Sequence, residues 1–200
     1  YYDIIVPSQY SIGSRQPVPS SWLISFEEKV PSMFWRGSST GGALRGPSCN
    51  GKLFHRQRAV ELARKVNSDT EIQDASFLDF AFTEYKYCET DSCEWMDRSY
   101  GPLSKQVPFS DNWLYAYLFD IDGNSWSQRF EQFLWGNSLV FRAGIFGQWF
   151  DGWLQEWKHF IPVSLDFDGG TNEGEENVIW DGDLMKKFRW AQTHEEEVKR

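Results

Sequence analysis

The sequence is short of basic residues, of long apolar runs and of glycosylation acceptors. Twenty Lys and Arg residues stand against 29 Asp and Glu, which gives a formal net charge of −9. A surface with that balance repels a phosphate backbone, so we expect no nucleic-acid partner. No run of about 18 apolar residues occurs, so no membrane span is expected. Asn-x-Ser/Thr acceptors are absent, and glycosylation therefore gives no indication of the compartment.

Cysteine is scarce as well, because the sequence contains only Cys49, Cys88 and Cys93. Three cysteines are too few for a disulfide framework, and the spacing of Cys88 and Cys93 suits zinc poorly. These two flank a short polar segment and could form a bridge in an oxidising compartment. The first seven residues hold no initiator Met, no basic region and no cleavage site, so we expect a start within a longer protein.

Aromatic residues are abundant, with 16 Phe, 11 Trp and 8 Tyr making up 18 % of the chain. We expect most of the tryptophans in the core, and the rest could stack on bases or sugar rings. Apolar residues make up 40 % of the sequence and charged residues 24 %, which is typical of a globular chain. A length of 200 residues suits one domain, or one and a part.

Strand-like and helix-like segments alternate along the chain. The expected strands are residues 33–35, 113–119, 138–141 and 160–163. The expected helices are residues 56–66, a segment that opens near Ser125 and ends at Gly136-Asn137, a short amphipathic piece at 149–157, and a final helix at 184–199. Residues 67–110 show only short apolar pieces and a Cys-containing loop. The alternation is typical of an open, doubly wound α/β sheet.

Three segments could bind an anion. The loop 36–42 is rich in Gly, Ser and Thr, although no Walker lysine follows it. Arg56 stands at a helix start, where its charge opposes the helix dipole unless an anion binds there. In the segment 120–130 a buried strand ends in a glycine turn, followed by hydroxyl groups and Arg129. Each segment could instead be ordinary: a surface loop, a solvated basic face or a simple capped helix.

Two further features carry weaker hypotheses. Asp120 and Asp122 could bind a divalent metal only if the strand continued through both, and the turn residues Gly123 and Asn124 argue against that. His159 lies beside an apolar strand, where a hydrogen-bonded core histidine is commoner than a catalytic one. No other histidine has a neighbouring partner that indicates a triad or a metal site.

Five motifs follow one another between residues 33 and 166, about two-thirds of the chain. They are Phe34-Trp35-Arg36-Gly37-Ser38 with Thr40-Gly41-Gly42, His55-Arg56-Gln57-Arg58, the run from Tyr117 to Phe130, Asn137-Ser138-Leu139-Val140-Phe141, and Trp157-Lys158-His159-Phe160-Ile161-Pro162-Val163. In this order they resemble the CAP10 family, glycosyltransferase family 90. The family includes protein O-glucosyltransferases of animals and capsule-associated proteins of fungi, and the first two motifs resemble the fungal branch.

The resemblance implies a GT-B architecture of two facing Rossmann-like domains, with an inverting, metal-free transfer of glucose or xylose from a UDP-sugar to a glycan or protein hydroxyl. No cofactor is expected beyond the donor. Carried over by position, Ser38 and Arg56 would contact the nucleotide sugar. The segment around the diphosphate would be Asn124, Ser125, Trp126, Ser127, Gln128 and Arg129. The resemblance also implies the lumen of the secretory pathway.

The family's catalytic base is an aspartate well upstream of the Arg-Gly-Ser loop. Only 37 residues precede Ser38, so we expect the base segment to be missing and leave the catalytic residue unassigned. Residues 1–32 are interpreted as an irregular Pro- and Ser-rich connection from a missing domain, and residues 33–200 as an incomplete Rossmann-like domain that binds the UDP-sugar. The alternative is a non-catalytic carbohydrate- or nucleotide-binding module on the same fold.

Overall fold

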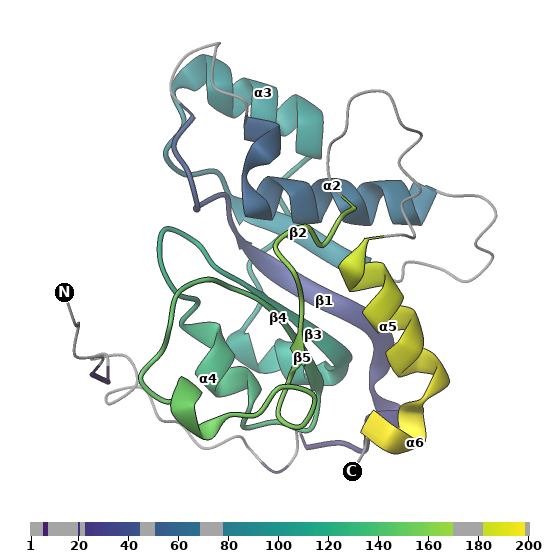
Figure 1. Cartoon of the computed structure of the whole chain (residues 1–200). Helices are drawn as coiled ribbons and strands as arrows, with labels where there is room; N and C mark the ends of the chain where they lie inside the picture. Colours follow the sequence, from purple (N-terminus) through teal and green to yellow (C-terminus); the bar gives the residue numbers. More distant parts are fainter. Residues whose placement is uncertain are drawn as a thin grey trace.

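A parallel β-sheet forms the centre of the protein (Figure 1). The computed structural model describes residues 6–7, 20, 23–44, 51–68, 78–169 and 182–198. Within them the sheet has five strands in the order β2-β1-β3-β4-β5, and every neighbouring pair is parallel. The strands are β1 (Val30–Ser38), β2 (Leu78–Glu84), β3 (Tyr115–Ile121), β4 (Leu139–Ala143) and β5 (Ile161–Pro162). The predicted α/β class is therefore confirmed, with a Rossmann-like sheet.

Helices cover the sheet and connect its strands. The α-helices are α2 (His55–Ser68), α3 (Thr90–Tyr100), α4 (Arg129–Phe133), α5 (Asp183–Thr193) and α6 (Glu195–Val198). Short 3-10 turns occur at η2 (Phe26–Glu28), η3 (Gly51–Leu53), η4 (Phe109–Leu114) and η5 (Asp151–Trp153). Among the described residues, no helix is long and apolar enough to cross a membrane.

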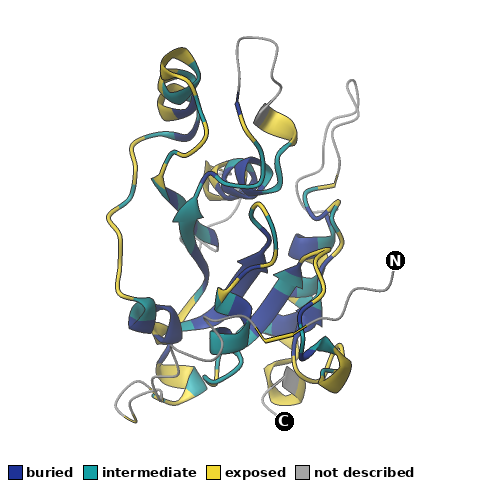
Figure 2. Cartoon of the chain, turned by 90° about the vertical axis from the view of Figure 1, so that its left-hand side faces the viewer, coloured by how far each residue is buried: buried dark blue, intermediate teal, exposed yellow. Residues whose placement is uncertain are grey.

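Alternating side chains divide the core into two layers. On β1, Met33 and Trp35 pack in the same cluster as helices α2 and α5, whereas Phe34 packs in the cluster of α4. On β3, Phe119 and Leu118 divide in the same way. This is the two-residue period of a strand that is buried on both faces. Figure 2 shows the strands mostly in the buried and intermediate colours, with exposed residues chiefly on the outer loops and turns.

Phenylalanine fills more of the core than tryptophan does. The largest fully buried side chains include Phe119, Phe141 and Phe188, and the Trp35 ring is buried beside them. In the connection between β4 and β5, however, the side chains of Trp153 and Trp157 are 71 % and 55 % exposed. The expectation of a core position is therefore wrong for these two tryptophans.

Several element boundaries differ from the sequence prediction. The strand predicted from residue 113 begins at Tyr115, because residues 113–114 belong to the 3-10 turn η4. The amphipathic helix predicted at 149–157 is only the turn η5, after which Leu154 takes an extended conformation. The final helix breaks at His194. Three glutamates then lie in the first turn of α6, where the helix dipole favours them, rather than at the end of α5.

The region 67–110 contains two elements that the sequence prediction left unassigned, β2 and α3. Cys88 and Cys93, whose pairing the sequence left open, form a disulfide across the start of α3, with their Cα atoms 5.3 Å apart. The bridge joins the end of the β2–α3 connection to the first turn of the helix. The segment between the cysteines was expected to be a loop, but α3 already begins at Thr90.

Candidate functional site

The order in which the chain adds strands to the sheet reverses between β1 and β3. From β1 the chain passes through α2 to β2 at one edge, and from β3 it passes through α4 to β4 on the other side. Ligands of open α/β sheets bind outside the carboxyl ends of the strands at such a switch point. A pocket of about 380 Å³ lies there. We call it the switch-point pocket, and it is lined by Arg36, Gly37, Ser38, Thr40, Arg56, Gly123, Asn124, Ser125, Trp126, Ser127, Gln128 and Arg129.

All eight residues that the sequence analysis selected therefore line one pocket. Ser38 comes from the end of β1, Arg56 from the first turn of α2, and the other six from the segment that follows β3. The helix expected to open near Ser125 begins only at Arg129 and is five residues long. The candidate site is thus a loop between β3 and α4, and the predicted helix N-terminal cradle at Ser125 is wrong.

Arg56 joins the carboxyl ends of the two central strands. Its Nη1 donates to the Ser38 carbonyl at 2.9 Å and to the Thr40 hydroxyl at 2.6 Å. On the other side, Nε donates to the carbonyl of Asp122 at 3.0 Å. Burial lowers the pKa of Arg56 to about 9. These acceptors explain how an arginine is tolerated at a helix start, where the helix dipole opposes its charge.

Arg129 lines the same pocket and, like Arg56, lies over the Trp35 ring. Its Nη1 donates to the carbonyl of Arg36 at the end of β1. Its Nη2 is buried and makes no hydrogen bond. The residue as a whole is only partly buried, but the guanidinium is enclosed, and burial lowers its pKa. The charge of Arg129 also lowers the pKa of Arg56, so the two guanidinium groups repel each other beneath the pocket.

Asp120 is the carboxylate beside Arg129. It is 1 % exposed, and burial raises its pKa to about 6, although the charge of Arg129 and the hydroxyl of Ser127 lower it. Neither oxygen of Asp120 nor the Ser127 hydroxyl makes a hydrogen bond of ordinary geometry. Ser127 and the Arg129 guanidinium therefore lie under the pocket wall. Asn124, Trp126 and Gln128 are the exposed part of the loop.

Two glycines keep the strand ends close together. A Cβ on Gly123 would lie 2.8 Å from the Thr40 hydroxyl and 2.9 Å from Nη2 of Arg56. Gly41 has a φ of +106°, which disfavours other residues, and its N–H donates to Asn124 Oδ1 at 2.9 Å. Because neither glycine has a side chain, the loops after β1 and β3 approach each other closely, and backbone atoms there remain available to a ligand.

The sequence analysis did not assign Thr40, Gly123 or Asp122 to the site. Thr40 and Gly123 line the pocket, and their place in the loops after the two central strands is the signal that would have found them. Asp122 stands just after β3, and its Oδ2 accepts N–H groups of the loop after β4. Asp120 and Asp122 thus have separate surroundings. Among the described residues, no group of three His, Cys, Asp or Glu side chains could hold a metal ion.

His159 belongs neither to the core nor to the pocket. The residue is exposed, and its Nδ1 accepts the backbone N–H of Gln155 at 2.8 Å in the turn before β5. The expectation of a buried histidine is wrong, because the connection between β4 and β5 turns outward here.

A parallel, doubly wound sheet with two buried guanidinium groups at its switch point defines a Rossmann-like domain with a candidate anion site. Comparison with known proteins agrees with this class. The family model described as Glycosyl transferase family 90 matches residues 18–200. The chain belongs to this family, as its motifs predicted.

Two named relatives agree with this family assignment. The chain is 30 % identical over 176 residues to Protein O-glucosyltransferase 2 of Danio rerio, covering 88 % of the chain and 27 % of that protein. It is 23 % identical over 146 residues to Protein O-glucosyltransferase 3 of Mus musculus, covering 72 % of the chain and 24 % of the relative. The chain therefore spans about a quarter of the length of these relatives.

Proposed function

We propose that the chain is the donor-binding part of an inverting glycosyltransferase. The enzyme moves a sugar, glucose or xylose, from a UDP-sugar to a hydroxyl of a glycan or protein, without a metal ion and within a GT-B arrangement. Family membership supports the reaction class. The observation that carries the donor site is the pair of buried guanidinium groups, Arg56 and Arg129, that repel each other at one pocket. A bound diphosphate would offset that repulsion.

Each part of the pocket has a separate task in this proposal. Residues 124–128 line the pocket, so the backbone N–H groups of this segment and the side chains of Ser125 and Gln128 are candidate donors for phosphate oxygens. Arg56 and Arg129 supply positive potential from beneath, in a site where low dielectric strengthens it. Ser38 contributes from the end of β1, on the opposite side of the pocket.

The chemistry follows from these tasks. An acceptor hydroxyl attacks the anomeric carbon, its proton passes to a carboxylate, and the bond between that carbon and the UDP oxygen breaks with its electrons going to UDP. The guanidinium groups stabilise the diphosphate as it leaves. We assign the carboxylate to no residue of this chain, because Asp120 is buried beside Arg129 and Asp122 is bound to a neighbouring loop.

The secretory-pathway lumen is the compartment that we propose for the enzyme. The disulfide between Cys88 and Cys93 supports it, because such bridges persist where the surroundings are oxidising.

Calorimetric titration with UDP tests the donor site. We expect the wild-type chain to bind UDP, and Arg129→Ala to weaken binding by about 1.5–3 kcal/mol if the guanidinium makes a charge-assisted contact. Gln128→Ala should also weaken binding, and its exposed side chain makes a folding defect implausible. Arg98→Ala on α3 is the matched control, because that side chain is 69 % exposed and lies outside the pocket.

Unchanged UDP affinity in both pocket variants would refute the assignment of this pocket. A transfer assay with the full-length enzyme then separates catalysis from simple binding. Sensitivity of that transfer to EDTA would contradict the proposed metal-free reaction.

A further inference from the structure

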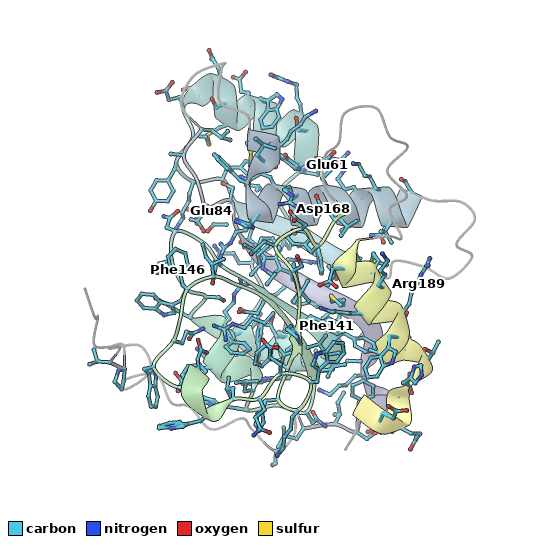
Figure 3. The ribbon with its side chains drawn as sticks, in the orientation of Figure 1. Glu61, Glu84, Phe141, Phe146, Asp168 and Arg189 are labelled. Carbon is cyan, nitrogen blue, oxygen red and sulfur yellow. A yellow bond between two sulfur atoms is a disulfide. The ribbon has the colours of Figure 1, made fainter. Side chains whose placement is uncertain are left out.

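Two tryptophans in the connection between β4 and β5 lie against each other outside the sheet. In Figure 3, Phe141 of β4 lies inside the molecule and Phe146 at its outer edge, so the chain has left the sheet before it reaches them. The ring centroids of Trp149 and Trp153 are 5.1 Å apart and their planes cross at 85°, so the edge of one ring meets the face of the other. We call these two residues the tryptophan pair. Neither of them lines the switch-point pocket.

The rings of the pair are held by the core. Trp149 packs edge to face on Phe150, with centroids 5.6 Å apart, and Phe150 stacks on Phe130 of α4 at 6.0 Å. Both phenylalanines are buried in the core layer on the α4 side of the sheet. The enclosed Nε1 of Trp149 makes no hydrogen bond, so ring contacts fix its position. Trp153 nevertheless remains 71 % exposed.

The backbone that carries Trp153 is fixed as well. The Asp151 carboxylate accepts the Gln148 N–H at 2.7 Å and forms an ion pair with Arg142 of β4 at 2.8 Å. The N–H of Trp153 donates to the carbonyl of Phe150 at 3.0 Å. An exposed ring on a fixed turn loses little conformational freedom when a ligand covers it, and this favours binding.

The space beside the exposed ring suits a small ligand. Gly152 precedes Trp153, and a Cβ at Gly152 would have no atom within 4 Å, so the adjoining backbone surface is open. One tryptophan side chain offers about 150–250 Å² of contact area. A stable protein–protein interface covers about 800 Å² on each partner. The tryptophan pair is therefore too small for a protein interface by itself and matches one or two sugar rings.

The chemistry of the pair fits one kind of sugar. A pyranose whose hydroxyl groups are all equatorial, such as glucose or xylose, presents only C–H groups on its two faces. The negative face of an indole attracts these C–H groups, while the hydroxyl groups at the edge of the sugar stay in water. A formal net charge of −9 on the chain disfavours an acidic glycan.

We infer that the tryptophan pair binds a neutral glycan built of glucose- or xylose-like pyranoses, with one sugar ring stacked on Trp153. This inference goes beyond the proposed function, because the pair can bind a glycan whether or not the switch-point pocket binds a UDP-sugar. In the proposed enzyme, such a surface keeps a glycan chain close to the domain that modifies its hydroxyl groups.

Calorimetric titration with cellohexaose, xylohexaose and mannohexaose tests the inference. We expect the wild type to bind cellohexaose or xylohexaose more tightly than mannohexaose, because the axial hydroxyl of mannose interrupts one face of the sugar. Trp153→Ala should weaken binding about tenfold or more, and Trp153→Phe should weaken it less, because a smaller ring keeps part of the contact. The urea midpoint of both variants should equal that of the wild type, since the side chain is 71 % exposed. Tyr87→Ala is the matched control, because this aromatic side chain is 57 % exposed and lies in the connection between β2 and α3.

Four results would overturn the inference. The wild type binds neither cellohexaose nor xylohexaose, or it binds mannohexaose as tightly as these. Tyr87→Ala weakens binding as much as Trp153→Ala does. The wild type self-associates and Trp153→Ala makes it monomeric, in which case the pair is an interface between copies of the chain.

Titration with UDP separates this inference from the proposed function. Trp153→Ala should bind UDP as the wild type does, because Trp153 does not line the switch-point pocket. If the wild type binds UDP but no hexasaccharide, only the glycan surface is wrong. If it binds a hexasaccharide through Trp153 but does not bind UDP, only the proposed donor site is wrong.

Discussion

Replacing Arg56 with alanine would remove the side chain that connects the ends of β1 and β3. Its guanidinium donates to backbone carbonyls on both sides of the switch point and to the Thr40 hydroxyl. In Arg56→Ala these acceptors lose this donor. We expect the variant to fold less stably and to bind UDP weakly.

The expected loss follows from two opposing contributions. A hydrogen bond from a charged donor contributes about 1.5–3 kcal/mol, and three bonds of 3.0 Å or shorter are lost. The cost of burying the guanidinium opposes this gain, since burial lowers its pKa to about 9. The net decrease in the free energy of unfolding should therefore be about 2–4 kcal/mol. The free energy of unfolding of Arg56→Lys should lie between those of the wild type and Arg56→Ala, because an ammonium keeps the charge but not the planar set of donors.

Urea unfolding followed by tryptophan fluorescence measures this change. Arg98→Ala serves as the control, because the ion pair of Arg98 with Glu94 is exposed at 3.7 Å and its loss should change stability by less than about 0.5 kcal/mol. A decrease for Arg56→Ala no larger than that of the control would refute the view that Arg56 holds the strand ends together.

Three more predictions concern other parts of the structure. The free energy of unfolding of the wild type, minus that of Asp120→Asn, should fall by about 2 kcal/mol as the pH rises from about 4 to 6. Burial raises the pKa of Asp120 to about 6, so the folded protein binds this proton more tightly than the unfolded chain, and a difference that does not change with pH would contradict this reasoning. Gly123→Ala should weaken UDP binding because its Cβ would lie 2.8–2.9 Å from a hydroxyl and a guanidinium, whereas Gly152→Ala, with no atom within 4 Å of its Cβ, should bind UDP as the wild type does. Replacing Cys88 and Cys93 with serine should cost about 2 kcal/mol in thermal unfolding experiments, because the bridge closes a loop with a sequence separation of only 5, and an unchanged melting temperature would argue against the bridge.

The central strands were predictable because a continuous run of apolar side chains indicates a strand that is buried on both faces. The apolar run before Asp120 identified β3 as a strand buried on both faces, although the strand begins two residues later than predicted and continues through Asp120 to Ile121. The edge strand β2 carries a clear alternation of buried and half-buried residues, but polar Asp79 and Thr83 interrupt the apolar run that was sought. Helix α3 buries only Met96 and Tyr100, so most of its length gives little hydrophobic signal.

The candidate site was predictable in part of its membership but not in its geometry. Contiguous motifs identified every residue of the segment Asn124–Arg129, which lines one pocket with Ser38 and Arg56. The direction of individual side chains depends on partners distant in sequence. Ser127 lies near Asp120 rather than in the open pocket, and no local pattern indicates that. A second pocket, which includes Gly41, Asp122, Ala143 and Leu165, combines residues at the carboxyl ends of four strands, so it exists only once the sheet has formed.

The loop after β4 is attached to Asp122 through backbone N–H groups alone. Its side chains at positions 145 and 146 therefore have no share in the attachment, and any amino acid except proline preserves it. These two positions are suited to saturation mutagenesis, because a combinatorial library there leaves the framework of the sheet intact.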